Sequence, residues 1–330
     1  MGACDRWNTV RYRGTRRGHY ESWFVRANHP TQARAFWIRY TIFSPKGRPE
    51  DAVGELWAIA FDQEADRVVA AKSVVPIAQS RFSQTTTDVR VGDASLSATA
   101  LEGAVTMGET TVSWSLQYAG TDAPLLLLPE PLYKAPLPKA KALVPQPSVT
   151  FKGHLVVDGE RWEIADWVGS QNHNWGSKHT DHYAWAQVAG FDDAPGVFFE
   201  CATARIKLGP LWTPPLTVAV LRLPDAEIRL NTIRQSIRAS GTLDGLTWMV
   251  ESATKDVELT ARVSAPRGSF VGLTYPNPPG GSKTCLNSKL ARCELTVRRR
   301  GHDELRLLTQ HRAAFEILTD DPDPEIPVVV

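Results

Sequence analysis

The stretch Phe36–Phe43 reads FWIRYTIF, and it decides the fold class. β-Branched and aromatic residues dominate this stretch, which favours a β-strand, and the turn residues SPKG follow it directly. Two further runs of the same kind cover Glu55–Phe61 and Val68–Val75. No segment before residue 120 carries a sustained helical stripe of apolar residues. The first half is therefore predicted to consist of strands.

The second half repeats this pattern. Runs of strand-forming residues at 154–157 and 161–164 flank Asp158-Gly159, a strong signal for a two-residue hairpin. Further runs follow at 182–191, 197–208 and 217–223, while 305–318 could be the last strand or a short helix. Strands and turns recur at a spacing of roughly 8–12 residues, which is typical of an all-β barrel or sandwich.

A proline-rich stretch separates the two halves. Six prolines fall within residues 129–147, and proline lacks the backbone donor that a central strand needs. A chain of 330 residues suits two domains. We therefore expect an N-terminal barrel at 1–128, a linker at 129–147 and a C-terminal barrel at 148–330.

Composition excludes several classes of protein. The net charge is +1, with 37 basic against 36 acidic residues, so no nucleic-acid partner is expected. The four cysteines are too sparse for a secreted disulfide framework, although Cys285 and Cys293 could face each other across a hairpin. Met1–Asn8 lacks the apolar core of a signal peptide, and no run could span a membrane. A cytoplasmic protein is expected, with peripheral membrane contact left open.

The densest polar and aromatic cluster runs from Asp166 to Glu200. His173, His179 and His182 could serve as zinc ligands, but their spacing matches no closed structural site, so neither metal nor cofactor is expected. The alternative is a polar loop whose His and Asn side chains cap backbone groups at a barrel mouth. Eleven tryptophans in the chain add to the expectation of aromatic-lined interiors.

An acid–base interpretation rests on two pairs of residues. On a strand, residues two apart face the same side, so His173 pairs with Trp175 and Phe198 pairs with Glu200. Apolar neighbours surround Glu200 in the sequence, and a carboxyl group in such surroundings has a raised pKa and can act as a general acid. Glu200 could equally point outward, because both parities of its strand contain apolar residues.

Two further charges lie within apolar strands of the first half. Glu21 shares a strand face with Trp23, and Arg39 shares one with Trp37. A buried Glu21–Arg39 salt bridge inside the first barrel is predicted, with a structural role.

Several of these motifs resemble a known group of proteins. The stretch 18–26, GHYESWFVR, resembles the opening motif of the tocopherol cyclase and AttH-like proteins. Asn172–Gly176, NHNWG, followed by 183–187, YAWAQ, resembles the second-barrel signature of that group, whose superfamily also includes the carotenoid 1,2-hydratases. The resemblance covers most of the chain and implies an all-β fold of two consecutive antiparallel lipocalin-like (calycin) barrels.

The resemblance also implies a function. Relatives protonate, hydrate or cyclise isoprenoid-type molecules, and a His-x-Trp pair followed by an aromatic-x-acid pair is thought to form their site. Here this implicates Glu200 and His173 as catalytic residues, although Phe and Glu stand where the hydratases have Tyr and Asp. We expect an isoprenoid, lipid or polyketide-like ligand that is hydrated or cyclised without a cofactor, or else only carried. The expected ligand-binding residues are Trp175, Phe198, Trp185, Tyr183, Gln187, Asn174, Glu21, Trp23 and Arg39.

Overall fold

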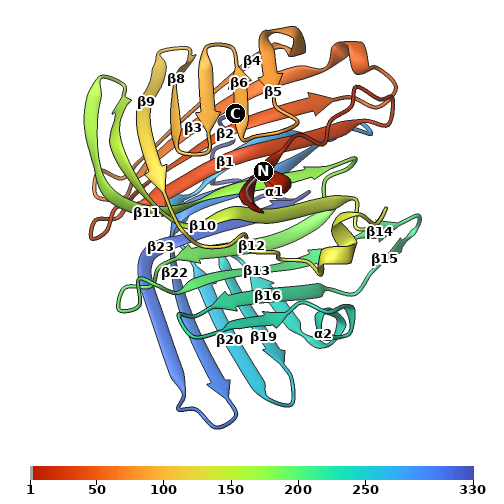
Figure 1. The fold of residues 1–330 in the computed structure, drawn as a ribbon, viewed down its shortest axis with the longest axis vertical. Helices are drawn as coiled ribbons and strands as arrows, with labels where there is room; N and C mark the ends of the chain where they lie inside the picture. The colour runs from red at the N-terminus through yellow and green to blue at the C-terminus, as the bar shows by residue number, and fades with distance from the viewer. Residues whose placement is uncertain (1–2) are drawn as a thin grey trace.

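The computed structural model describes residues 3–330, without the side chains of residues 3–5 and 208. Met1 and Gly2 of the N-terminal segment therefore lie outside the described residues. Two large antiparallel sheets make up the chain, one formed mainly by its first half and the other by its second half (Figure 1). The all-β prediction of tandem lipocalin-like barrels is confirmed.

The first sheet has eleven strands in the order β4-β3-β2-β1-β11-β10-β9-β8-β7-β6-β5. It curls around a single apolar core to which ten of these strands contribute. The strands are β1 (His19–Asn28), β2 (Arg34–Ser44), β3 (Val53–Asp62), β4 (Arg67–Pro76), β5 (Ser80–Phe82), β6 (Asp88–Val91), β7 (Ala94–Ser97), β8 (Ala100–Met107), β9 (Thr110–Ala119), β10 (Ala140–Val157) and β11 (Glu160–Gly176).

The second sheet has ten strands in the order β17-β16-β13-β12-β23-β22-β20-β19-β18, with β21 paired to β22 outside this path. Its strands are β12 (His182–Ala189), β13 (Phe198–Arg205), β16 (Leu216–Arg222), β17 (Glu227–Leu230), β18 (Ser240–Asp244), β19 (Thr247–Ala253), β20 (Val257–Ser264), β21 (Val271–Pro276), β22 (Ser282–Arg299) and β23 (Leu305–Thr319). A separate hairpin joins β14 (Lys207–Leu208) to β15 (Leu211–Trp212), and the α-helices are α1 (Ala3–Asn8) and α2 (Ile233–Arg238). The ambiguous segment 305–318 is thus a strand.

The two sheets pack against each other through one face each. Because side chains alternate along a strand, the central strands send one parity into their own barrel and the other parity toward the opposite sheet. In β13, Phe199 and Cys201 join the core of the second barrel, whereas Phe198 joins an apolar cluster shared by both sheets. Both parities of β13 are buried for this reason, which is why its sequence carries no alternating pattern.

The division between the sheets differs from the predicted boundary at 129–147. Strand β10 begins at Ala140, and β10 and β11 both belong to the first sheet, so the sheets divide after Gly176. Pro145 and Pro147 fit into β10 because its pairing with β11 shifts register on either side of Gln146, as at a β-bulge. β9 pairs with β10 only from Thr150 onward, so the prolines lie where β10 has no ladder on that side.

Two further observations concern the cysteines and the membrane. Cys285 and Cys293 lie on the same strand, β22, as free buried thiols, so they do not face each other across a hairpin. Among the described residues, no helix is long and apolar enough to cross a membrane.

Candidate functional site

The surface where the two sheets meet holds the largest set of predicted site residues. We call the side chains of both sheets that pack there the inter-sheet layer. Its apolar part includes Phe24, Trp37 and Trp57 from the first sheet and Trp185, Phe198 and Val220 from the second. The charged side chains Arg26, Arg39, Glu200 and Lys289 are buried on the same faces.

Glu200 lies at the centre of this layer and points inward. It stands opposite Gln187 on β12 and Val220 on β16, and its side chain is buried. Oε1 accepts hydrogen bonds from Trp185 Nε1 at 2.9 Å and from Gln187 Nε2 at 3.4 Å. Oε2 has no hydrogen-bond partner among the described residues. One carboxyl oxygen is thus held in place while the other is free.

Burial raises the pKa of Glu200 to about 7, against the opposing effects of the bonds from Trp185 and Gln187 and of the Arg26 charge. Near neutral pH a large fraction of the Glu200 carboxyl groups therefore carries a proton. A protonated carboxyl group with an unpaired oxygen is able to donate that proton to a group placed beside it.

Gln187 binds Glu200, and the hydrogen-bond partners of Gln187 fix the orientation of its side-chain amide. Its Oε1 accepts from Arg26 Nε at 3.1 Å and from Ser170 Oγ at 2.6 Å. Its Nε2 donates to Asn172 Oδ1 at 2.8 Å as well as to Glu200. An amide rotated by half a turn would present its oxygen to the acceptors of Asn172 and Glu200, so only this orientation satisfies every partner.

Arg26 carries its charge without a carboxylate partner within 4 Å among the described residues. Its guanidinium donates to Gln187 Oε1 and O, to Asn28 Oδ1 and to Arg312 O instead. Burial lowers the pKa of Arg26 to about 9, and Glu200 opposes this shift. Arg26 thus supplies the positive potential that keeps the pKa of Glu200 from rising further.

A second buried cation lies close by. Lys289 Nζ donates to Asn287 Oδ1 at 2.5 Å and to Glu316 Oε1 at 2.9 Å. It also stands 5.6 Å from the ring centroid of Trp37 and 5.8 Å from that of Trp185. The indole that binds Glu200 therefore has a lysine ammonium group over its ring.

The sequence analysis missed Arg26, Ser170, Asn172, Lys289 and Glu316 as parts of this network. Arg26 and Lys289 did leave a signal, since each is a charge inside a strand of mostly apolar residues. The partner of Arg26 on the other sheet could not be identified, because Arg26 and Gln187 are 161 positions apart in the sequence.

Arg39 also faces the inter-sheet layer, but apart from Glu200. It donates to Ser22 Oγ through Nε and Nη2 and lies 4.5 Å from the ring centroid of Tyr275. Beside it is a cavity of about 10 Å³, room for about one water molecule. A surface hollow of about 410 Å³, also lined by Phe43, lies next to this cavity.

The predicted Glu21–Arg39 salt bridge is wrong. Glu21 stands opposite Ile42 on β2, three residues from Arg39, so the two side chains lie on opposite faces of the sheet. Glu21 points into the first barrel, and Arg39 points toward the second sheet.

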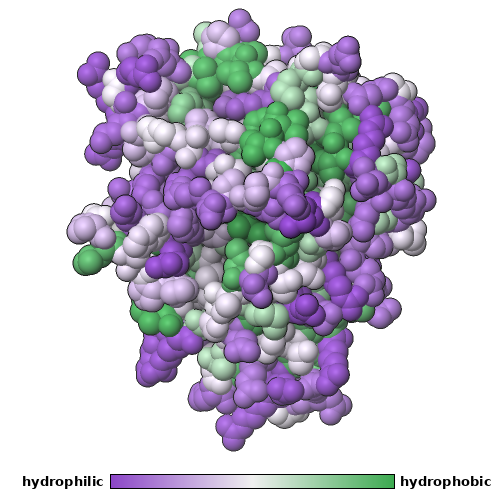
Figure 2. All heavy atoms as spheres, turned by 180° about the vertical axis from the view of Figure 1, so that it is seen from behind, coloured by the Kyte–Doolittle hydropathy of each residue, from purple (hydrophilic) through white to green (hydrophobic). Residues whose placement is uncertain are grey.

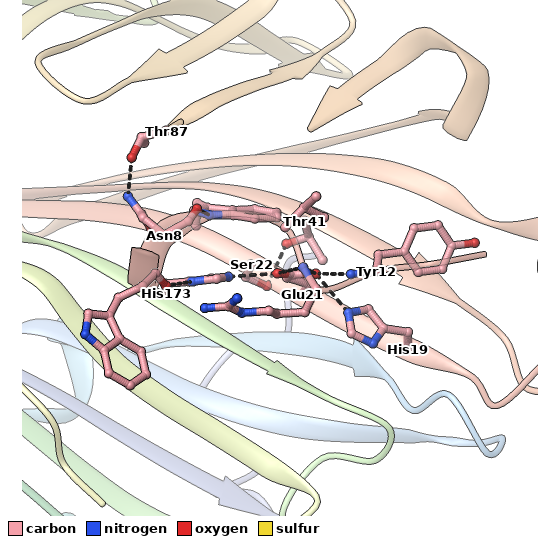
Figure 3. A network of polar contacts seen from close by, with 12 residues as sticks. Asn8, Tyr12, His19, Glu21, Ser22, Thr41, Thr87 and His173 are labelled. Carbon is pink, nitrogen blue, oxygen red and sulfur yellow. Dashed lines mark hydrogen bonds and ion pairs between the residues drawn. The ribbon is translucent and has the colours of Figure 1, made fainter. Parts of the chain in front are cut away.

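Glu21 instead binds the N-terminal segment and two histidines (Figure 3). Its carboxylate accepts from the backbone N–H groups of Arg11 and Tyr12, from His19 Nε2 at 2.9 Å and from His173 Nε2 at 2.9 Å. Burial alone would raise the pKa of Glu21, but the bonds from His173 and His19 outweigh it and lower the pKa to about 2.

His173 is fully occupied by this clamp. Nδ1 lies 2.8 Å from the carbonyl oxygen of Trp7, and its ring stacks on Trp23 and against Trp175. Trp7 O and the Glu21 carboxylate thus engage both ring nitrogens of His173. This is close to the barrel-mouth alternative of the sequence analysis, with the N-terminal segment as the part that is held.

The structure therefore divides the predicted site residues into two groups. Trp23 stands opposite His173 and Phe24 stands opposite Asn172, so neighbouring residues of β11 face different sides of the sheet. His173, Trp175, Glu21 and Trp23 line the mouth of the first barrel. The inter-sheet group contains Glu200, Phe198, Trp185, Tyr183, Gln187, Asn174 and Arg39.

The three histidines considered as zinc ligands occupy separate environments. His173 binds Glu21, and His182 pairs with Asp320 at 3.0 Å. His179 stacks on Tyr20 with 3.9 Å between ring centroids, and burial, with Arg39 nearby, lowers its pKa to about 3.

A strap at residues 123–128 covers one side of the inter-sheet layer. Leu125 and Leu127 pack into the shared cluster, and Leu125 pairs with Val144 of β10 through an isolated bridge. Arg222 Nη1 donates to the carbonyl of residue 123 at 2.6 Å, and Asn231 Nδ2 donates to Leu127 O at 3.0 Å. In Figure 1 the yellow trace that follows β9 runs across the front between β10 and the strands β12 and β13.

Comparisons with known proteins find relatives by structure. Neither a protein-family model nor a curated protein sequence matches this chain. An AttH-type protein from Nitrosomonas europaea matches with a TM-score of 0.55 and 15% identity, over 91% of this chain and 92% of that chain. Kievitone hydratase from Nectria haematococca matches at 0.56 and 12%, over 91% and 89%. CghA matches at 0.56 and 12%, over 93% and 90%. At these identities the likeness establishes a shared fold over nearly the whole chain.

Proposed function

We propose that the protein is a cofactor-independent hydratase or cyclase acting on a hydrophobic ligand with a carbon–carbon double bond. The observation that carries this proposal is the Glu200 carboxyl group, which is buried, has a pKa of about 7 and leaves Oε2 without a partner among the described residues. A buried polar atom without a partner costs free energy, and such costs are concentrated at functional sites. A carrier that only encloses its ligand has no use for this group.

In the proposed reaction, protonated Glu200 transfers the proton on Oε2 to one carbon of the double bond. The π electrons form the new C–H bond and leave a carbocation on the neighbouring carbon. Water then attacks this carbon in a hydration, or a hydroxyl group of the same ligand attacks it in a cyclisation. The proton released by the attacking oxygen returns to the Glu200 carboxylate, so the enzyme ends as it began.

The other residues of the layer take supporting roles. Trp185 and Gln187 are positioning residues, because both donate to Oε1 and so aim Oε2. Phe198 shares the strand face of Glu200, and its ring face would stabilise positive charge on the ligand. His173 has no part in the proton transfer, since both of its nitrogens are engaged on the other face of β11.

The ligand class follows from the surroundings of Glu200. Apart from the polar network, the shared cluster is made of aromatic and aliphatic side chains, which suit an isoprenoid, lipid or polyketide-like molecule. The strap is the proposed route of entry. Among the described residues of the second half of the chain, only the side chains of Arg222 in β16 and Asn231, directly after β17, hydrogen-bond to it.

Deuterium transfer tests the proposal. A lipid extract of the host organism is incubated with the protein in D2O and analysed by mass spectrometry. The wild type should add deuterium to one component, and Glu200→Gln should not, because an amide cannot donate the proton. Tryptophan fluorescence with the same extract should show that Glu200→Gln still binds.

Glu55→Gln is the matched control. Glu55 is also a buried glutamate, but its carboxylate already pairs with Lys72 at 2.9 Å. It should retain deuterium transfer. Equal transfer by Glu200→Gln and the wild type would overturn the assignment of Glu200.

A further inference from the structure

One end of the second sheet exposes large apolar side chains. Hairpin β14–β15 projects there, beyond the end of β13 and the start of β16 (Figure 1). Leu211 is 71% exposed at its tip, and Trp212 beside it is also exposed. Globular proteins normally cover side chains of this size, and an exposed cluster of them marks a contact site.

Helix α2 adds to the same end. It follows β17, whose last residue Leu230 stands opposite Ala219 in the middle of β16, so the chain leaves β17 toward the start of β16. The helix packs against β16 and β19. Thr232 caps the helix with a capping box. Ile233 is 63% exposed and Ile237 is 54% exposed, and their spacing of four residues places both on one helix face. Figure 2, seen from behind, shows green atoms at its left edge, where the hairpin and α2 lie after the half-turn.

Positive charges outnumber negative ones around these side chains. The nearest carboxylates are Asp181, which accepts from the backbone N–H of Lys207, and Asp320, which pairs with His182 beside Trp212, and each of them also pairs with a lysine. Arg205 and Lys207 lie over the Trp212 ring at 5.3 Å and 5.9 Å from its centroid. Arg234 and Arg238 are exposed on α2. Among the described residues, none of these four cations forms an ion pair within 4 Å. Residues 205–224 and 228–243 contain no Asp or Glu.

The other basic cluster of this sheet provides a contrast. Arg298 and Arg300, at the hairpin between β22 and β23, pair with Glu304 and Asp256. That cluster is neutralised by its own neighbours, and it has no exposed large apolar side chain among the residues the structure describes there.

We propose that this end of the molecule, formed by Leu211, Trp212, Ile233 and Ile237 with their four cations, docks on an anionic lipid bilayer. Apolar side chains enter the boundary between headgroups and acyl chains, while Lys and Arg bind the anionic headgroups. The docking does not depend on the proposed catalysis by Glu200. It would bring the protein to the lipid bilayer, in which a hydrophobic ligand of the proposed class dissolves.

Vesicle co-sedimentation of the full chain tests the proposal. The wild type should sediment with vesicles of phosphatidylcholine mixed with phosphatidylglycerol, less with phosphatidylcholine alone, and less at high salt. Replacing the cations (Lys207→Gln, Arg234→Gln and Arg238→Gln together) should weaken binding to the mixed vesicles by roughly a hundredfold. Replacing the apolar pair (Leu211→Ser with Ile237→Ser) should weaken it on both kinds of vesicle.

Two matched controls should bind as the wild type does. Val74→Ser removes a side chain that is 53% exposed on the first sheet, and Arg298→Gln with Arg300→Gln removes charge from the neutralised cluster. Glu200→Gln should also bind, which separates this proposal from the catalytic one. Absence of vesicle binding by the wild type would overturn the docking proposal, as would unchanged binding by both test variants. Self-association lost in the apolar variant, without vesicle binding, would assign the surface to a second copy of the chain instead.

Discussion

Arg26 and Glu200 come from different sheets and bind opposite ends of one side-chain amide, that of Gln187. The cation holds the amide oxygen and the carboxyl group receives the amide N–H. Through this amide, the positive charge of Arg26 on the first sheet acts on the pKa of the Glu200 carboxyl group on the second sheet.

The first prediction concerns activity and pH. Glu200 must be protonated to act, and its pKa of about 7 implies that kcat/KM declines as the pH rises through neutrality. The pH profile of the turnover found in the deuterium experiment measures this decline. A profile that stays level from mildly acidic to mildly alkaline pH would contradict it.

The second prediction concerns stability. Because the pKa of Glu200 is raised from 4.5 to about 7 in the folded protein, folding favours the protonated form, and stability is lost as the pH rises from about 4.5 to about 7. Once the pH is above 7, the total stability lost through this group is on the order of 3 kcal/mol. Glu200→Gln removes it, so urea unfolding should find the variant gaining on the wild type between pH 5 and pH 8. If the free energies of unfolding of the variant and the wild type differ by the same amount at pH 5 and at pH 8, the pKa of Glu200 is not raised.

The third prediction concerns Arg26. Replacing it with methionine removes the positive charge that lowers the pKa of Glu200, so that pKa should rise and the proton should be retained to higher pH. Infrared difference titration, with Glu200→Gln as the blank, follows the carboxyl group directly. Arg39→Met is the control, since Arg39 is buried in the same layer and donates to Ser22 rather than to the Gln187 network. Equal shifts in both variants would show a general change of the layer instead.

The fourth prediction concerns the clamp formed by Glu21. Glu21→Gln replaces a buried carboxylate that accepts from two backbone N–H groups and two histidines, and it should lower the free energy of unfolding at neutral pH by about 3 kcal/mol. The pKa of Glu21 is depressed, so its contribution is complete above about pH 4.5 and disappears as the pH falls toward 2. Urea unfolding at pH 7 and pH 3 should therefore find a smaller difference at the lower pH. A constant difference would mean that packing, not charge, carries the effect.

The fifth prediction concerns the strap. Asn231→Ala removes the side-chain bond to Leu127 O and should raise the hydrogen-exchange rate of the amide of Leu125, which bonds to Val144 O. Amides in β23 serve as the internal control and should keep their protection. Faster exchange throughout the second sheet would point to global destabilisation rather than to release of the strap.

The sequence by itself determined most of the strands and which residues share a strand face, although the start of β10 at 140–147 was expected to be a linker. FWIRYTIF lies within β2, the turn at Asp158-Gly159 joins β10 to β11, and the side chains of Phe198 and Glu200 do share a face. These features depend on contacts between near neighbours and on the two-residue period of a strand, both of which can be read from sequence.

Only the tertiary structure decided which face of each strand meets which partner. His173 lies one residue from Asn172, yet one contacts the N-terminal clamp and the other joins the network of Glu200. In strands such as β13 both faces are covered, so apolar residues fill both parities and the pattern loses its direction. The burial of Glu200, its unpaired oxygen and the positions of Arg26 and Lys289 all follow from the packing of one sheet on the other. That packing joins residues more than a hundred positions apart, and no local pattern in the chain records it.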